Sequence, residues 1–177
     1  MKKYLQNMLV LTLCVCVQAV LYAGGTEPSE YLAQLPRTLQ ALIISFVEQM
    51  PVDLEAAIKL FAQQLAGNTE LSAFTGNSIV LEAIVRSYVQ RFGPQAALQE
   101  LTKAIDRADE PVIRALLSTG AIAINDYGIE RDTDLYTPLG YALLVSPVDT
   151  VALTTRVLPV LEQFGADTNK TASISER

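Results

Sequence analysis

The residues that could support chemistry lie close together in the last third of the chain. The stretch NDYGIERDTD, residues 125–134, carries four carboxylates: Asp126, Glu130, Asp132 and Asp134. Ca²⁺ accepts carboxylate oxygens in variable geometry, so such a loop could hold the ion. The spacing does not fit an EF-hand, because no glycine follows an Asp-x-Asp pair at the required place. We therefore expect a solvated acidic loop with no bound metal, and a cation site remains the alternative.

Most other catalytic chemistry is excluded by missing residue types. The chain has no histidine, and its two cysteines, Cys14 and Cys16, lie in an apolar N-terminal run. A histidine base, a Ser-His-Asp arrangement and histidine-ligated metals are therefore excluded. Removal of the apolar run would also remove every thiol. The sequence predicts a protein that is not an enzyme and needs no cofactor, with carboxylate chemistry at 126–134 as the enzymatic alternative.

The balance of charges argues against nucleic acid as a partner. The formal net charge is −6, with 13 basic and 19 acidic residues. The first 25 residues contain two lysines and no acidic residue, so their removal leaves 11 basic and 19 acidic groups, a charge of −8. Nucleic-acid binders present a basic surface, and no run of Lys or Arg supplies one here.

The N-terminus has the three parts of a secretory signal peptide. Lys2 and Lys3 precede an apolar stretch from Met8 to about Ala23, and small residues follow. Ala23 at −3 and Gly25 at −1 fit the small-residue rule for cleavage. The sequence therefore predicts a signal peptide at 1–25, export to a periplasm or to the outside, and no membrane contact after cleavage.

Two other interpretations of this segment stay open. The stretch could be retained as a membrane anchor, although it is short for a span of about 20 residues and contains Gln18. It could also be a lipoprotein signal ending at Cys14 or Cys16. Leu13 and Val15 stand before those cysteines, where a small residue is expected.

The rest of the chain has helical periodicity, and no segment alternates convincingly as a strand would. Apolar residues recur at spacings of three and four, and Pro and Gly interrupt them. The expected helices cover about 35–50, 52–66, 78–92, 94–106, 109–119 and two segments within 137–164. The predicted class is all-α.

Two C-terminal stretches share the same helix start and stop signals. Thr137 can accept a hydrogen bond from an orphan backbone N–H, and Pro138 then stands at the first helical position. Gly165 stands where a left-handed residue would end the helix that closes this stretch. Pro111 and Gly120 have the same roles in the preceding stretch. Each stretch is expected to form a helical hairpin, with Leu139 and Ala142 directed inward in the second.

These stretches resemble ankyrin repeats. TPLGYALL followed by LPVLEQFGADTN is similar to the family pattern that begins TPLHxAA and ends LLxxGADxN, and LTKAIDRADEPVIRALLSTGAIAIN resembles a preceding repeat without its TPLH opening. The resemblance covers about residues 101–169. It implies helical hairpins stacked as a short ankyrin-like solenoid, and a non-enzymatic module that binds other proteins.

The second stretch departs from the family pattern at several points. Gly140 replaces the usual histidine, and Leu143 stands where a second alanine is usual. Thr137 and Gly165 are 28 positions apart, whereas the pattern expects about 21. The extra residues must lie around 145–155. Residues 126–136 form a connector longer than the usual tight turn.

Two repeats rarely bury enough apolar surface to stand alone, and about three are needed. Residues 26–93 are therefore expected to form an N-terminal helical cap. This segment also has a fainter resemblance to the opening of an F-box, carried by Leu35, Pro36, Leu39, Ile43 and Phe46. The F-box family binds the adaptor of a ubiquitin ligase. An effector-like adaptor that joins this contact to an ankyrin-like contact is the alternative function.

The leading hypothesis is an exported, monomeric protein-interaction module. Its domains would be the signal peptide at 1–25, the helical segment at 26–93, two degenerate repeats at 94–169 and a flexible tail at 170–177. The partner would be a protein of unknown identity, bound by the finger around 126–136 and the helix after Thr137. The expected contact residues are Tyr127, Glu130, Asp132, Asp134, Tyr136 and Tyr141.

Overall fold

The computed structural model describes residues 30–171 and 174–175. The predicted signal peptide, and residues 172–173 and 176–177 of the predicted tail, lie outside this range. The chain divides into two compact units, Met1–Glu48 and Gln49–Arg177. The expected domain boundary after residue 93 differs from this division, because that position lies within a helix of the second unit.

The described part of the first unit is helical. It contains α2 (Glu30–Gln34) and α3 (Arg37–Val47), and α3 begins directly after Pro36. Leu39, Ile43 and Phe46 are buried, as their spacing of four and three residues predicts. These are also positions of the F-box resemblance. Burial is what any amphipathic helix requires, so that resemblance stays a prediction.

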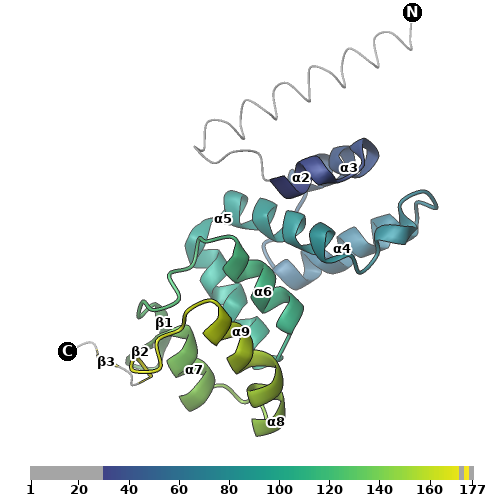
Figure 1. Cartoon of the computed structure of the whole chain (residues 1–177). Helices are drawn as coiled ribbons and strands as arrows, with labels where there is room; N and C mark the ends of the chain where they lie inside the picture. Colours follow the sequence, from purple (N-terminus) through teal and green to yellow (C-terminus); the bar gives the residue numbers. More distant parts are fainter. Residues whose placement is uncertain (1–29, 172–173, 176–177) are drawn as a thin grey trace, which may run out of the picture. The chain divides into compact units, whose positions relative to one another are not determined.

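The second unit is mostly helical with a small sheet (Figure 1). Its elements are α4 (Leu54–Ala66), η1 (Ser72–Phe74), α5 (Ser78–Asp106), α6 (Glu110–Ser118), β1 (Ile129–Arg131), β2 (Asp134–Tyr136), α7 (Pro138–Leu144), α8 (Thr150–Ala152), η2 (Leu153–Val157), α9 (Leu158–Gln163) and β3 (Ile174–Ser175).

Polar side chains fix where these helices begin. The side chains of Asp53, Asn77, Asp109 and Thr137 accept hydrogen bonds from backbone N–H groups in the first turns of α4, α5, α6 and α7. Each bond satisfies a donor that has no partner within the helix. The predicted starts at Asp109 and Thr137 are confirmed. Asn77 caps α5, which begins at Ser78 as the sequence predicts.

Glycines mark the predicted helix ends. Gly120 and Gly165 have φ of 71° and 85°, the left-handed conformation expected after a last helical turn. At Gly165 the following N–H, from Ala166, donates to the carbonyl of Leu161 over 3.0 Å, and Gly165 itself donates to Glu162. This pair of bonds is the Schellman ending of α9. Gly93, with φ of 83°, makes a kink within α5 instead of ending it.

Helices after the kink form two hairpins. Helix α5 packs against α6, and α7 packs against α9 and η2. The two helix pairs contact each other in two places: α5 contacts α7, and α6 contacts α9. The apolar side chains that these helices bury include Leu101, Ile105, Ile113, Leu116, Leu139, Val160 and Leu161. The prediction that this region is mostly helical is confirmed, and the stacking of two repeats stays a prediction.

The expectation that no strand occurs is wrong for residues 129–136. β1 and β2 pair antiparallel, with Ile129 opposite Tyr136 and Arg131 opposite Asp134. β3 pairs antiparallel with β2, so the sheet has the order β1-β2-β3. Strands of two or three residues carry too little alternation to be recognised in a sequence. The prediction of a mostly helical fold holds.

The extra residues of the second hairpin form an irregular helix. Asp149 caps α8 by accepting from the N–H groups of Val151 and Ala152, and the chain then continues as the π-helical η2. The hydroxyls of Thr154 and Thr155 donate to the carbonyls of Thr150 and Val151. Such side-chain hydrogen bonds compete with the backbone hydrogen bonds of the helix and favour a bend in it.

Charged side chains join α4 to the end of α5. Lys103 Nζ lies 3.0 Å from Asp53 Oδ2 and 2.7 Å from Oε1 of the buried Glu100. Arg107 forms an ion pair with Glu55. The hydrogen bonds that Lys103 donates to Glu100 and Asp53 raise the pKa of Lys103 to about 12, and a hydrogen bond from the backbone N–H of Ala56 lowers the pKa of Asp53. The buried Glu100 therefore has a cationic partner, as a buried charge requires.

Asp53→Ala is expected to destabilise the protein by about 1 kcal/mol, because α4 loses its N-terminal cap. The ion pair with Lys103 adds little, since half of each side chain is exposed. Chemical denaturation at pH 7 measures the change. The matched control is Glu55→Ala, which removes an exposed ion pair and no cap and should stay within about 0.5 kcal/mol of wild type. Equal losses in the two variants would contradict the capping role.

Candidate functional site

The acidic connector is an ordered hairpin rather than a plain loop. Asp132 and Thr133 make a two-residue turn between β1 and β2, and Asp132 has φ of 57°. Aspartate tolerates this left-handed conformation better than most residues. Gly128 closes the hairpin by donating its N–H to the carbonyl of Tyr136 over 3.2 Å. We call residues 126–136 with the first turn of α7 the hairpin surface.

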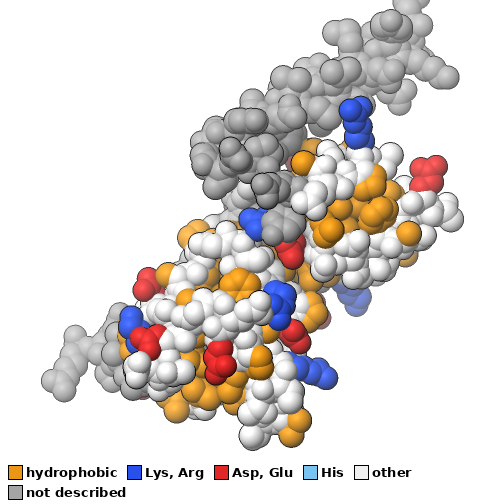
Figure 2. Space-filling view, viewed as in Figure 1, with side chains coloured by type: hydrophobic (Ala, Val, Ile, Leu, Met, Phe, Trp, Pro, Cys, Tyr) orange, Lys and Arg blue, Asp and Glu red, His pale blue; other side chains and the backbone are white. Residues whose placement is uncertain are grey.

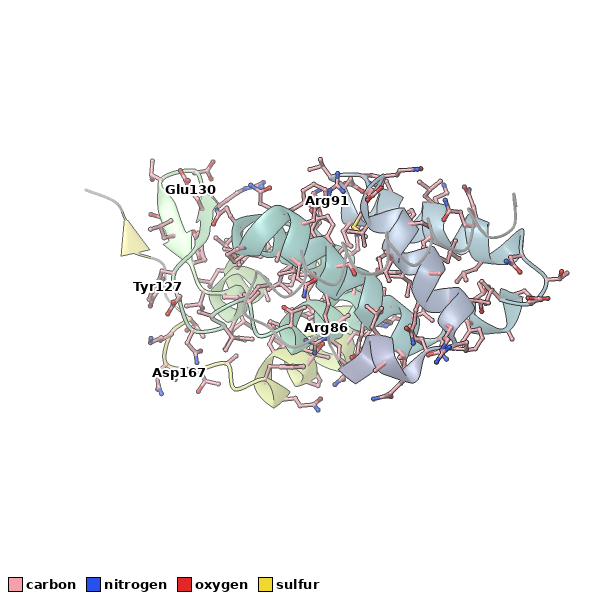
Figure 3. The ribbon with its side chains drawn as sticks, turned by 90° about the horizontal axis from the view of Figure 1, so that it is seen from above. Arg86, Arg91, Tyr127, Glu130 and Asp167 are labelled. Atoms are coloured by element: carbon pink, nitrogen blue, oxygen red, sulfur yellow. The ribbon has the colours of Figure 1, made fainter. Side chains whose placement is uncertain are left out.

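Five of the six predicted contact residues lie on this hairpin. Glu130 and Asp132 are exposed, whereas Tyr127, Asp134 and Tyr136 are half-buried. The hydroxyl of Tyr136 donates to Asp134 Oδ2 over 3.4 Å, a long hydrogen bond. Figure 3 shows Tyr127 and Glu130 at one end of the second unit, with Asp167 of the C-terminal segment at the same end.

The sixth predicted residue, Tyr141, is inside the protein. Its side chain is 2% exposed, and its hydroxyl lies 3.0 Å from both carboxylate oxygens of Asp106. Burial, followed by the hydrogen bond to Asp106, raises the pKa of Tyr141 to about 12. The structure thus uses Tyr141 to join α7 to the end of α5. A partner on the surface would not reach its ring.

Stability is expected to fall as the pH rises from about 10 to 12. The folded chain holds the pKa of Tyr141, and of the buried Tyr88, at about 12, above the usual value of 10. A raised pKa stabilises the fold below the unfolded pKa, and that contribution is lost as the pH rises through the folded value. Denaturation midpoints at pH 8, 10 and 12 measure this. Tyr141→Phe should weaken the decline, and an identical decline in that variant would contradict the assignment.

The four loop carboxylates do not converge on a point. Within residues 30–171 and 174–175, no group of three or more His, Cys, Asp or Glu side chains could hold a metal ion. Asp126 precedes the hairpin, Glu130 lies on β1, and Asp132 stands in the turn. The cation alternative for 126–134 therefore has no ligand geometry to support it in this structure.

Asn125 holds the C-terminal segment beside the hairpin surface. Its side-chain amide donates to the carbonyl of Gly165 over 2.9 Å and accepts from the N–H of Asp167 over 2.7 Å. The ammonium group of Lys170 donates to the carbonyl of Asn125 over 3.3 Å. Sequence analysis did not assign Asn125 a role. The signal that could have found it is its place as the Asn that closes the first stretch, GAIAIN.

Thr137 joins the start of α7 to the same segment. Its hydroxyl accepts from Gly140 N–H over 3.0 Å and donates to the carbonyl of Lys170 over 2.8 Å. Gly140 is where the chain departs from the ankyrin pattern, and the structure gives a reason. A Cβ at Gly140 would lie 2.8 Å from the carbonyl oxygen of Thr171. The missing side chain makes room for the C-terminal segment.

Gly140→Ala is expected to push this segment off α7. The new Cβ meets backbone at 2.8 Å, so the segment must move and the bond from Thr137 to Lys170 is lost. The overall free energy of unfolding should change little, because alanine favours the helix by about 1 kcal/mol over glycine and this gain offsets the lost hydrogen bond. Trypsin should therefore cut after Lys170 at least about tenfold faster, since a cleavable segment must first open. Gly67→Ala, where the Cβ meets nothing closer than 3.5 Å, should be cut at the wild-type rate.

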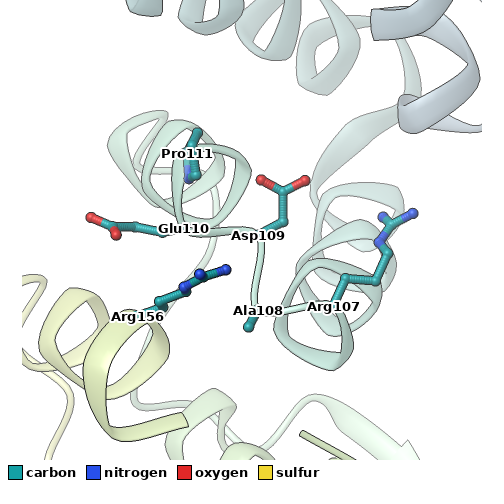
Figure 4. Close-up of a pocket in the computed structure, with 6 residues that line it drawn as sticks. All are labelled: Arg107, Ala108, Asp109, Glu110, Pro111 and Arg156. Atoms are coloured by element: carbon teal, nitrogen blue, oxygen red, sulfur yellow. The ribbon is translucent and has the colours of Figure 1, made fainter. Parts of the chain in front are cut away.

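A second candidate is a hollow at the α5–α6 turn. It has a volume of about 370 Å³ and is lined by Arg107, Ala108, Asp109, Glu110, Pro111 and Arg156. Figure 4 shows the guanidinium of Arg156 directed toward the turn. Three of the lining side chains already have structural roles: Asp109 caps α6, Glu110 pairs with Arg114 over 3.1 Å, and Arg107 pairs with Glu55.

The left-handed Ala108 at this turn also has a structural explanation. Its φ is 50°, and its N–H donates to the carbonyl of Ile105 while that of Asp109 donates to Ala104. These bonds end α5 by the Schellman pattern that ends α9. The conformation of Ala108 is thus required by the helix end, and the hollow offers no set of free polar groups aimed at one ligand. The hairpin surface is the stronger candidate.

Hydrophobic side chains are exposed beyond the hairpin surface as well. Leu143 and Leu144 at the end of α7 are 42% and 61% exposed, and Val151 in α8 is 70% exposed. Figure 2 shows hydrophobic side chains gathered over α7. Leu143 stands where the ankyrin pattern has a second alanine, and its side chain points out of the core.

Comparisons of the chain with protein-family models, curated proteins and solved structures found no match. Over residues 30–171 and 174–175, every helix is too short or too polar to cross a membrane.

Proposed function

We propose that this protein is a non-enzymatic module that binds another protein through the hairpin surface. The observation that carries the proposal is a β-hairpin held at one end of two packed helical hairpins. Glu130 and Asp132 are exposed on it, and Tyr127 and Tyr136 are half-buried beside them. Tyrosine supplies a large amphipathic contact area, and loops on a rigid frame are common binding elements.

The arrangement of helices supports a short ankyrin-like stack for 94–169. Helix α5 contacts α7 and helix α6 contacts α9, so equivalent helices of the two hairpins lie together. The β-hairpin lies between the two helical hairpins in sequence, where the family has its finger. A repeat scaffold has no fixed chemistry of its own, and its specificity lies in exposed residues. The acidic finger favours a partner with a basic surface.

Site-specific photocrosslinking tests the proposal. A photoreactive amino acid replaces Glu130 in one protein and Gln64, which is exposed on α4, in a matched control. In an extract of the native organism, the same partner should crosslink at position 130 and not at position 64. Glu130→Lys/Asp132→Lys should reduce capture of that partner at least about tenfold, as charge reversal at a complementary surface costs more than 1 kcal/mol. Equal crosslinking at both positions would reject the hairpin surface as the site.

We also propose that the chain is exported and that its mature form begins at Thr26. The basic residues, apolar run and small residues of the first 25 positions support this. Mass spectrometry of the native protein tests it through the mass of the N-terminal peptide. A peptide that still contains Met8 to Ala23 would support the retained anchor instead.

A further inference from the structure

The C-terminal segment lies on the surface that we assign to a partner. Figure 1 shows the end of the described chain passing beside β2. β3 pairs with β2 through Leu135 opposite Ile174 and Asp134 opposite Ser175. Upstream, Lys170 contacts both Thr137 and Asn125. A short strand thus covers one edge of the hairpin, and the chain upstream of it lies against the first turn of α7.

The contacts that hold this segment to the hairpin surface are mainly backbone contacts. Thr137 bonds the carbonyl of Lys170, Gly140 lies against the carbonyl of Thr171, and β3 pairs through the ladder. Ladder hydrogen bonds do not depend on the identity of the side chains. An extended segment from another polypeptide can therefore make the same bonds, as in recognition by strand addition.

One side-chain contact adds a preference for charge. The ammonium group of Lys170 reaches the carbonyl of Asn125, next to the exposed Asp126. Asp167 lies nearby, and its pKa is lowered by hydrogen bonds from Asn169 and by the charge of Lys170. A positively charged side chain is therefore favoured at the N-terminal end of the extended segment, which we call its entering end.

We propose that the edge of β2 is an acceptor for an extended polypeptide segment with a lysine or arginine at its entering end, and that β3 occupies this edge in cis until such a segment replaces it. The inference rests on the proposed function, since it supplies the binding mode of the hairpin surface. It also predicts regulation: a partner must compete with a tethered strand of high effective concentration. The apparent affinity is reduced by the fraction of molecules whose edge is occupied.

The test measures binding of a labelled synthetic peptide, residues 170–177 of this chain (KTASISER), to the full-length protein. Ile174→Pro/Ser175→Pro removes both N–H groups of β3, so the tethered strand cannot pair with β2. Ile174→Val/Ser175→Thr keeps the strand and is the matched control. We expect fluorescence anisotropy to show at least tenfold tighter binding by the proline variant than by wild type or the control. A peptide with the same two prolines should not bind.

Equal binding to the proline variant and to wild type, or binding to neither, would overturn the proposal. Hydrogen exchange on the wild-type chain gives a second test that needs no variant. The amides of Ile174 and Ser175 should exchange at least about a hundredfold faster than that of Tyr141, which donates to the carbonyl of Thr137. Equal rates would mean that β3 opens only when the whole unit unfolds. If the peptide binds but photocrosslinking at position 130 fails, the acceptor edge stands and the proposed partner site does not.

Discussion

Replacing Leu116 with aspartate is expected to unfold the second unit. Leu116 is fully buried in α6, in the core of the first helical hairpin. Loss of its side chain alone costs about 2–5 kcal/mol, and an unpaired carboxylate in the same place adds several more. The sum is comparable with the whole stability of a domain, about 5–15 kcal/mol. Circular dichroism during heating should show no cooperative transition.

The matched control for this variant is Leu144→Asp. Leu144 lies at the end of α7 and is 61% exposed, so the same substitution places the charge in water. Its effect on the free energy of unfolding should stay within about 0.5 kcal/mol. If Leu116→Asp melts like this control, Leu116 is not in a hairpin core and the packing described above is wrong.

Tyr141→Ala is the second change with a large expected effect, about 3–5 kcal/mol. The variant loses a buried aromatic ring between α7 and α5 and leaves a cavity. Tyr141→Phe keeps the ring and removes only the hydroxyl bonded to Asp106, which should cost about 1.5–3 kcal/mol. Denaturant titration of both variants separates packing from hydrogen bonding. A Phe variant as stable as wild type would mean that the contact with Asp106 adds nothing.

Local chemistry made the helix boundaries predictable from the sequence. The cap at Thr137, the proline that follows it and the glycine after α9 depend on interactions within a few residues. A helix start needs a short polar side chain, and a helix end needs a residue that tolerates positive φ. Both requirements are visible as residue types, so the start of α7 and the end of α9 could be placed from the sequence.

The hairpin surface was harder to predict because its contacts join distant residues. Asn125 meets Gly165 and Asp167 across about 40 positions, and Thr137 meets Lys170. The place of Asn125 at the close of GAIAIN sets it apart, but it does not indicate these partners. The glycine at position 140 was visible as a departure from the ankyrin pattern, but its cause is a backbone oxygen 31 positions later.

Tyr141 shows a different limit of sequence analysis. A tyrosine suits both an interface and a core that offers its hydroxyl a partner. The choice depends on Asp106, 35 positions earlier at the end of another helix. The apolar periodicity of α7 placed Leu139 and Ala142 inward, as the structure confirms. That periodicity does not indicate whether the neighbouring ring of Tyr141 is buried or exposed.

The π-helical turn of η2 has a consequence for how this chain can vary in length. A π turn holds one residue more than an α turn of the same helix, so a single insertion is absorbed there without shifting the residues on either side. Deletion of one residue within Leu153–Val157 would restore a regular α-helix. The same face of α9 would still contact α6. Arg156 would then point elsewhere, while Val160 and Leu161 would stay in the core. Relatives of this protein should therefore differ by single-residue gaps at this turn before they do so in α6 or α7.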